Sequence, residues 1–261
     1  MIYRTGCSGW SYEFWRGKIY NYSEPSSNFL NDYSRIFDTV EIDSTFYAAQ
    51  GQETVKKWYD SVPDNFLFSP KMPRKITHEE RLVKCEDDLV YFIKNISILG
   101  EKLGIILVQL PPDFTFNLTV LENFLEMLPD ELKYAVEFRH ISWFRKEVYD
   151  ILKKYNVIMV WSVIDYLKTP EIKTTENLYV RFLGNKSLTK KELGELRINR
   201  RSEVMQWVEK IKNHDSGNGT AFIYANNHYE GLSPDTIKFV RYRLGMPAPP
   251  SMVVDRQKKL F

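Results

Sequence analysis

Eight short runs of β-forming residues recur along the chain, and most gaps between them carry the periodicity of a helix. This alternation implies parallel strands joined by crossover helices, because a tight turn cannot connect two parallel strands. Eight such units in about 250 residues predict a (β/α)8 barrel of the TIM type, with a doubly wound open sheet as the alternative. The predicted strands span residues 3–9, 39–43, 66–71, 105–110, 134–138, 157–161, 178–182 and 221–225.

Apolar residues spaced as i, i+3, i+4 and i+7 predict helices in several gaps. Thr119 with Glu122 predicts a capping box, and Ser233 with Pro234 predicts the start of the last helix. The gap at 162–177 has no such stripe, so we expect the helix after the sixth strand to be missing or reduced. Residues 184–200 predict a long basic loop. The apolar stripes are Leu121, Phe124, Leu125 and Leu128; Val148, Ile151, Leu152 and Tyr155; and Val204, Trp207, Val208 and Ile211.

No linker divides the chain, so we predict one barrel domain over residues 1–245 and a proline-rich tail over residues 246–261. The net charge of +2 gives no overall field that would demand nucleic acid or a membrane. Cys7 and Cys85 form neither a metal pattern nor a disulfide framework, which fits a reducing compartment and a cytoplasmic location. No apolar run approaches the roughly 20 residues of a membrane span, so we expect no membrane association.

Polar and charged residues gather where the predicted strands end, which is where barrel enzymes have their active sites. Side chains alternate along a strand, so Glu137 and Arg139 are expected to point inward while Val136 and Phe138 face the helices. Inward charges are costly unless they are paired or used, so the ring of strand ends predicts a functional pocket. The strand ends carry Ser8, Trp10, Glu41, Asp43, Lys71, Gln109, Glu137, Arg139, His140, Arg181, Asn226, Asn227 and His228.

Several motifs, in matching order over nearly the whole chain, resemble those of the DUF72 family, also called YecE-like. They are residues 6–12 with Trp15; residues 40–47; Thr77 and His78 with Arg81 and Leu82; residues 109–112; residues 137–140 with Ser142 and Trp143; and residues 226–228. The resemblance implies a (β/α)8-type barrel and a pocket, and it does not imply a reaction.

The chain departs from this pattern at three positions. Asp43 stands where the resemblance leads us to expect asparagine, and no proline follows Tyr47. Leu183 stands where we expect histidine, which indicates that a histidine at that position is not essential to the chemistry.

The preferred interpretation is a cationic pocket that binds or hydrolyses a phosphoester or nucleic-acid ligand. Guanidinium forks suit phosphate oxygens, and aromatic rings stack on bases. The alternative is that the arginines only pair with the nearby carboxylates. Whether the protein is an enzyme stays open, and a phosphodiesterase- or nuclease-like hydrolase is favoured among enzymes. The cations are Lys71, Arg74, Arg139, Arg145 and Arg181, and the aromatic residues are Trp10, Tyr12, Trp15, Tyr47 and Trp143.

Two other interpretations of the pocket stay open. Glu41 and Glu137 are carboxylates on separate strands, as a glycoside- or sugar-acting enzyme requires. Against this, Arg139 and Lys71 would lower the pKa values of these carboxylates and disfavour a protonated general acid. The other interpretation is a module that binds its ligand without turning it over.

Three histidines also raise the question of a metal. His78, His140 and His228, together with a carboxylate, supply enough ligands for a divalent ion. The four histidines of the chain show no HxxxH or HxH spacing, and the neighbouring cations oppose a divalent ion. We therefore predict no cofactor and no metal site, with a divalent metal as the alternative.

The pocket residues are assigned separate roles. We predict that Glu41, Lys71 and Glu137 are catalytic. The predicted ligand-binding residues are Trp10, Tyr12, Asp43, Tyr47, His78, Gln109, Arg139, His140, Trp143, Arg181, Asn226, Asn227 and His228.

The end of the chain predicts a docking segment. Three prolines between residues 247 and 250 favour an extended conformation. Gln257, Leu260 and Phe261 then resemble the short peptide by which replication and repair proteins dock on sliding clamps. We therefore expect these three residues to bind a sliding clamp, with the alternative that the tail covers the bottom of the barrel.

Overall fold

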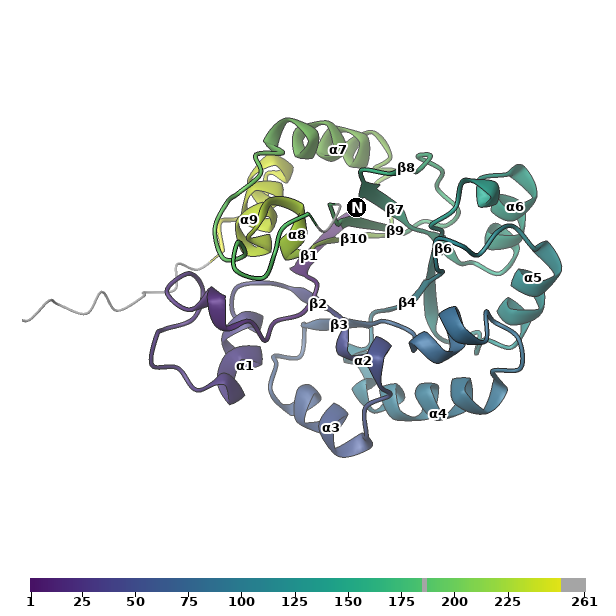
Figure 1. Cartoon of the computed structure of the whole chain (residues 1–261), viewed down its shortest axis with the longest axis horizontal. Coiled ribbons are helices and arrows are strands. Elements are labelled where there is room, and N and C mark those ends of the chain that lie inside the picture. The colour runs from purple at the N-terminus through teal and green to yellow at the C-terminus, as the bar shows by residue number, and fades with distance from the viewer. Residues whose placement is uncertain (185–186, 250–261) are drawn as a thin grey trace, which may run out of the picture.

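The computed structural model describes residues 1–184 and 187–249, with parallel strands at the centre and helices around them (Figure 1). The residues predicted to dock on a sliding clamp, Gln257, Leu260 and Phe261, lie outside the described residues. In the part described, no helix is long and apolar enough to cross a membrane.

The strands form three hydrogen-bonded sheets. The first sheet has the order β1 (Ile2–Cys7), β10 (Thr220–Ala225), β9 (Leu178–Phe182), β7 (Trp161–Ile164), β8 (Leu167–Lys168). The second pairs β2 (Thr39–Ile42) with β3 (Leu67–Pro70), and the third has the order β4 (Ile105–Gln109), β5 (Lys133–Glu137), β6 (Ile158–Met159). Every pairing is parallel except that of β7 with β8, so the predicted α/β fold with parallel strands is confirmed.

Short contacts join the three sheets in sequence order around a ring. A single bridge between Ser8 and Glu41 connects β1 to β2, and a bridge between Lys71 and Leu107 connects β3 to β4. The third junction is covalent, because only Val160 separates β6 from β7. The arrangement is therefore TIM-barrel-like, with the regular strand pairing interrupted at three places.

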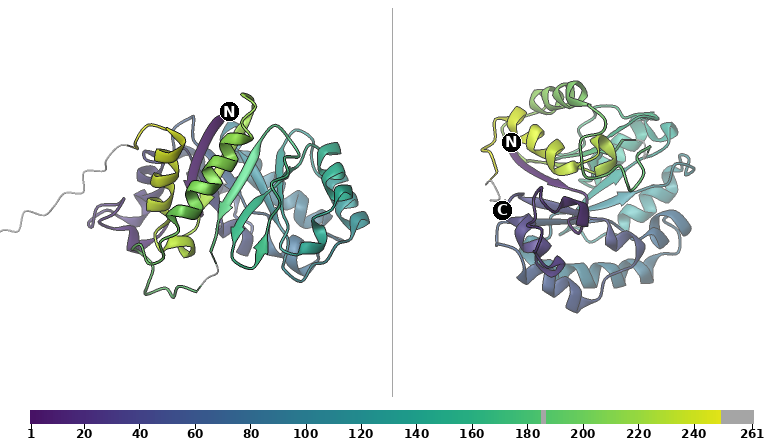
Figure 2. Two further views of the ribbon diagram at one scale, coloured as in Figure 1. Left: turned by 90° about the horizontal axis from the view of Figure 1, so that it is seen from above. Right: turned by 60° about the vertical axis from the view of Figure 1, so that its left-hand side comes forward.

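The helices lie outside the ring of strands in the two further views (Figure 2). The apolar stripes predicted for three helices are confirmed, since Leu121, Phe124, Val148, Val204 and Val208 are fully buried. A π-helix spans Lys75–Glu79 and 3-10 helices span Glu13–Trp15, Ser26–Asn28, Ser97–Lys102 and Ile141–Trp143. The α-helices are α1 (Phe29–Ser34), α2 (Ser44–Tyr47), α3 (Gln52–Asp60), α4 (Glu86–Ile96), α5 (Leu118–Glu126), α6 (Lys146–Lys154), α7 (Arg201–Asn213), α8 (Asn227–Glu230) and α9 (Ser233–Leu244).

The unit after the sixth predicted strand lacks a helix, as expected. In its place β7 and β8 form a short antiparallel hairpin, which leads to β9. The predicted end of that strand at residue 161 is wrong, because β7 continues to Ile164 and pairs with β9. The described part of the 184–200 loop contains no regular helix or strand.

Two predicted helix caps are wrong by one or two residues. Helix α5 begins at Leu118, and the side chain of Asn117 accepts a hydrogen bond from the Val120 amide at 3.2 Å, so Thr119 does not cap it. Ser233 is already inside α9, where its hydroxyl donates to Asn227 Oδ1 at 2.9 Å instead of capping the helix.

The strands separate two apolar layers. Ala135 packs with Leu107 and Tyr179 in a small cluster inside the ring, while Val136 and Phe138 belong to the larger core beneath the helices. The alternation predicted for β5 is therefore confirmed. It places Glu137, two residues after Ala135, on the inner face of the ring at the strand's carboxyl end.

Candidate functional site

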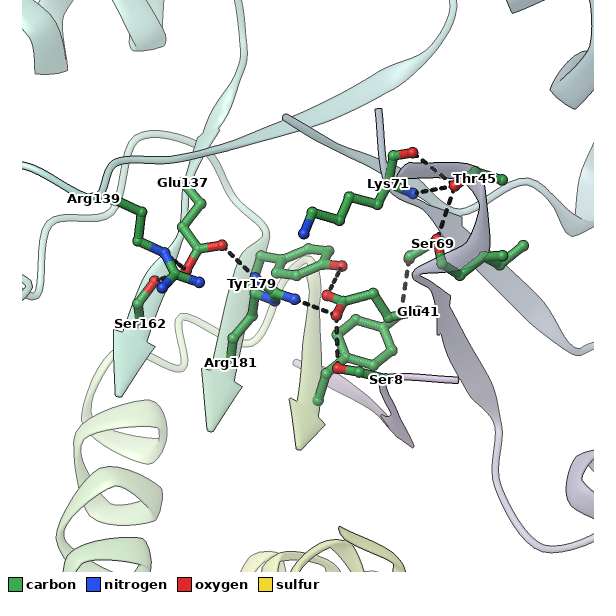
Figure 3. Close-up of polar contacts among 12 residues, drawn as sticks. Ser8, Glu41, Thr45, Ser69, Lys71, Glu137, Arg139, Ser162, Tyr179 and Arg181 are labelled. Atoms are coloured by element: carbon green, nitrogen blue, oxygen red, sulfur yellow. Dashed lines mark hydrogen bonds and ion pairs between the residues drawn. The ribbon is translucent and has the colours of Figure 1, made fainter. Parts of the chain in front are cut away.

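A network of buried charges lies at the carboxyl-terminal ends of the strands (Figure 3). At its centre, Arg181 on β9 donates from Nη2 to Glu41 Oε1 at 2.5 Å and from Nη1 to Glu137 Oε2. All three side chains are almost fully buried. Glu41 belongs to the β2–β3 sheet and Glu137 to the β4–β6 sheet, so one guanidinium joins all three sheets. We call Glu41, Lys71, Glu137, Arg139 and Arg181 the strand-end cluster.

The oxygens of both carboxylates are already engaged. Glu41 also accepts hydrogen bonds from the hydroxyls of Ser8 at 2.7 Å and Tyr179 at 2.8 Å. Glu137 accepts one from Ser162 at 2.5 Å, and Arg139 Nε lies 2.8 Å from its Oε1 in an ion pair. Buried carboxylates need such partners, and these two have little capacity left for a ligand.

The surrounding cations decide the protonation of Glu137. Burial by itself would raise the pKa of this carboxyl group, but Arg139 and Arg181 outweigh it and lower the pKa to about 2. Glu137 is therefore a carboxylate at neutral pH. Burial opposes the charge of Arg181 as well, yet Glu137 and Glu41 together raise the pKa of the guanidinium further above its ordinary value.

Lys71 differs from the other members of the cluster because its charged group contacts an aromatic ring and no carboxylate within 4 Å among the described residues. Its side chain is 8% exposed, and Nζ lies 3.9 Å from the centre of the Phe46 ring. Figure 3 shows the side chain extended toward the Glu137 side of the cluster. Among the described residues, Nζ makes neither a hydrogen bond nor an ion pair within 4 Å. Burial lowers the pKa of Lys71 to about 8, although Asp43 favours the charged form.

His78 contacts Phe46 as well, the same ring that lies against Lys71. Its ring meets Phe46 edge to face at 4.9 Å, and its Nδ1 lies 2.9 Å from the Thr77 hydroxyl. Burial, followed by the charge of Lys71 and of nearby arginines, lowers the pKa of His78 to about 4. His78 is therefore neutral at pH 7 and does not add to the positive charge of the site.

The charges around the cluster balance. Arg139 is only partly buried, and its Nη1 donates to the hydroxyl of the exposed Tyr166 at 2.8 Å. The ring of strand ends was predicted to be cationic, but the three cations of the cluster are offset by three carboxylates, of which Glu41 and Glu137 form ion pairs with the arginines. These are Lys71, Arg139 and Arg181 against Glu41, Asp43 and Glu137.

The other candidate ligand-binding residues lie around the same end of the ring and keep some contact with solvent. Tyr47 on α2 is 79% exposed. Tyr12 donates its hydroxyl to the Ser8 carbonyl at 2.7 Å, Trp10 packs edge to face on Trp58, and His140 Nδ1 lies 2.8 Å from Ser142 Oγ. The half-buried residues are Trp10, Tyr12, Asp43, His78, Gln109, His140, Asn226 and His228.

Two predicted ligand-binding residues are part of the core instead. Trp143 is fully buried, stacks on Phe138 and donates its indole N–H to the Phe114 carbonyl at 2.6 Å. Asn227 Oδ1 accepts hydrogen bonds from Trp15 Nε1 and from Ser233, which fixes α8 against the first loop. Trp15 is fully buried too, so neither tryptophan offers a ring face for stacking on a base.

Three residues of the network had no predicted role. Tyr179 precedes Arg181 by two residues on β9, so strand alternation alone would have placed it on the inner face. Ser162 was missed because the sixth strand was ended three residues too early. Phe46 lies within the second motif, but nothing in the sequence signals that its ring contacts the Lys71 ammonium.

In residues 1–184 and 187–249, no group of three or more histidine, cysteine, aspartate or glutamate side chains is arranged to hold a metal ion. The carboxylates of the strand-end cluster are occupied by arginine and hydroxyl donors.

Comparisons with known proteins match one family over almost the whole chain. A family model described as "Protein of unknown function DUF72" matches residues 4–257. The UPF0759 protein YecE of Escherichia coli K12 is 37% identical over 118 residues, which are 45% of this chain and 43% of that protein. The UPF0759 protein YunF of Bacillus subtilis 168 is 30% identical over 159 residues, covering 58% and 55%. The matches thus span about half the length of these curated relatives.

Solved structures give the same answer. A DUF72 family protein from Thermotoga maritima superposes with a TM-score of 0.80 at 26% identity, covering 94% of this chain and 100% of that one. D-Psicose 3-epimerase from Clostridium cellulolyticum, solved with D-tagatose, has a TM-score of 0.52 at 9% identity, covering 92% and 95%. At that identity the likeness concerns the fold alone.

Proposed function

This chain belongs to the DUF72 family, and from its strand-end cluster we propose that it binds a small hydroxylated molecule carrying an anionic group of the phosphoester class. The observation that carries the proposal is the Lys71 ammonium, which is buried without a hydrogen-bond acceptor. Burial disfavours the charged form of Lys71, and an anionic ligand oxygen beside the ammonium would stabilise it.

The unused hydrogen-bonding capacity of the site indicates the chemistry of the ligand. The unused part of the Arg139 guanidinium supplies donors that suit the oxygens of a phosphate group, and Lys71 supplies a donor for another oxygen of the ligand. The carboxylate of Asp43 is half-buried, has no side-chain hydrogen bond among the described residues, and suits a hydroxyl group. A small molecule with both kinds of group would use each of them.

Nucleic acid is less well supported as the ligand. The rings of Trp15 and Trp143 are buried in the core, which removes two of the five aromatic side chains expected to stack on bases. The charges of Lys71, Arg139 and Arg181 are offset by nearby carboxylates, so these three cations leave little net positive charge for a phosphate backbone.

Glycoside hydrolysis by Glu41 and Glu137 is less well supported as well. With a pKa lowered to about 2, Glu137 holds no proton to donate at neutral pH. Arg181 also binds both carboxylates through one guanidinium, which leaves no room for a sugar between them.

Calorimetric titration with inorganic phosphate and with glycerol 3-phosphate tests the proposal. We expect Arg139→Gln to weaken binding by about tenfold or more, since hydrogen bonds to charged groups contribute roughly 1.5–3 kcal/mol. Lys133→Gln is the matched control, because Lys133 is exposed at the far end of the strand that Arg139 follows. Failure of both probes to bind at low ionic strength would refute the proposal. So would an equal loss of affinity in the control variant.

A further inference from the structure

Building on the proposed ligand, we propose that Lys71 is a nucleophile that forms an imine with an aldehyde or ketone group of that ligand. The substrate class is then a small phosphorylated hydroxy-aldehyde or hydroxy-ketone. The inference deepens the proposed function by assigning a covalent step to one residue of the strand-end cluster.

The position of Lys71 is fixed by its backbone. The Lys71 amide donates to the Ile42 carbonyl at 3.2 Å, and the Thr45 hydroxyl donates to the Lys71 carbonyl at 2.7 Å. These bonds hold the residue at the carboxyl end of β3 against β2 and the start of α2 (Figure 3). Because the backbone is fixed, the side chain can extend in only a few directions, and it reaches over Phe46.

The environment of the Lys71 nitrogen is unlike that of Lys102, the other deeply buried lysine among the described residues. Lys102 is 3% exposed, and its Nζ donates to the carbonyls of Tyr59 at 2.9 Å and Val62 at 2.8 Å. Lys71 Nζ has no such acceptor among the described residues. It is also not sealed from solvent, so water can reach it. The hydrogen bonds of Lys102 are made to backbone carbonyls, as in a structural lysine, whereas the nitrogen of Lys71 is left to bond an incoming group.

The protonation of Lys71 fits this role. Only the neutral amine carries the lone pair that attacks a carbonyl carbon. Burial, with a smaller contribution from Arg181, lowers the pKa of Lys71 to about 8 from an ordinary value of 10.5. At neutral pH its neutral fraction is therefore on the order of a hundredfold larger than that of an ordinary lysine.

The reaction balances without an oxidant or reductant. The Lys71 nitrogen forms a bond to the carbonyl carbon, and the π electrons move to the carbonyl oxygen, which takes up a proton. The nitrogen then loses a proton, the hydroxyl group takes up a proton and leaves as water, and a carbon–nitrogen double bond forms. A protonated imine withdraws electrons from the neighbouring carbon, which is the usual purpose of such a lysine.

Reductive trapping on the full chain tests the inference. The protein is incubated with glyceraldehyde 3-phosphate and sodium cyanoborohydride, and the labelled lysines are located by peptide mass spectrometry. We expect most of the label on Lys71, at a rate that rises as pH increases toward 8, and little on Lys102. Lys71→Arg removes the nucleophile and should lose this label, whereas the control variant Lys133→Gln should keep it.

The outcomes separate the two proposals. Binding of glycerol 3-phosphate without label on Lys71 would overturn the imine while leaving the anionic ligand in place. Label spread evenly over exposed lysines such as Lys133 would also overturn it, because that pattern is non-specific glycation. Failure of glycerol 3-phosphate to bind would remove the proposed function itself.

Discussion

At the scale of single residues, Lys71 works against the stability of the fold. Its pKa is about 8 in the folded protein and near 10.5 when exposed, so the unfolded chain binds more protons between these pH values. The unfolding free energy therefore rises as pH increases from about 8 to 10.5, and the full penalty is present below pH 8. Keeping Lys71 in this site therefore lowers the unfolding free energy at neutral pH but retains a reactive amine.

We expect Lys71→Met to be more stable than the wild type at pH 7 by up to about 3 kcal/mol. The difference should shrink above pH 8 and disappear above about pH 10.5, as measured by urea unfolding at a series of pH values. Lys102→Met is the control and should be less stable throughout, since it leaves two backbone carbonyls without their donor. A Lys71→Met protein that is less stable at pH 7 would contradict this account.

The sequence predicted the members of the strand-end cluster but not which of them pair with one another. Alternation along a strand and the rule that barrel sites lie at strand ends were sufficient to select Glu41, Lys71, Glu137, Arg139 and Arg181. Which cation remains without a partner depends on distances between residues up to 140 positions apart in the chain. No local pattern carries that information, and the burial of Trp143 was missed for the same reason.

At the scale of secondary-structure elements, the ends of helices and strands were the least predictable part. Thr119 with Glu122 satisfies the capping-box pattern, yet Asn117 caps α5 because the helix begins at Leu118. Asparagine is a stronger N-cap residue than threonine. Because Asn117 precedes Thr119 by two residues, the helix begins two residues earlier than the capping box would place it. The sixth strand was likewise ended too early, although the alternation of polar Ser162 with apolar Val163 is compatible with a strand.

Two substitutions in α5 check the observed cap. Asn117→Ala should lower the unfolding free energy by about 1 kcal/mol, because the Val120 amide loses its acceptor. Thr119→Ala is the matched control and should change it by less than about half as much, since alanine favours the helix interior. Urea unfolding monitored by tryptophan fluorescence measures both, and a larger loss in Thr119→Ala would restore the capping box.

At the scale of the whole molecule, Arg181 connects parts that the strand pairing leaves nearly separate. The three sheets meet through isolated bridges or a covalent link, and this one guanidinium binds a carboxylate from each of the other two. The parallel α/β class and the family could be predicted from the sequence. The interruptions between sheets could not, because strand register is set by twist and packing around the full ring.

Arg181→Met should lower the unfolding free energy by about 3–5 kcal/mol, because it leaves Glu41 and Glu137 buried without their cation. Adding Glu41→Gln and Glu137→Gln removes the uncompensated charges and should recover much of that loss. The comparison of the single and triple variants by urea unfolding separates the charge effect from lost packing. A triple variant as unstable as the single one would mean that the shape of the arginine, and not its charge, holds the sheets.

The junctions between the sheets also bear on how wide the face that carries the cluster can open. Lys71 is carried on one sheet and Arg139 follows a strand of another, so a molecule touching both would span the β3–β4 junction. Widening the ring there breaks a few hydrogen bonds, such as that from the Met72 amide to the Leu107 carbonyl, and no complete strand ladder. The distance by which these strand ends can separate is thus limited less by strand hydrogen bonds than by the contacts of Arg181 with Glu41 and Glu137.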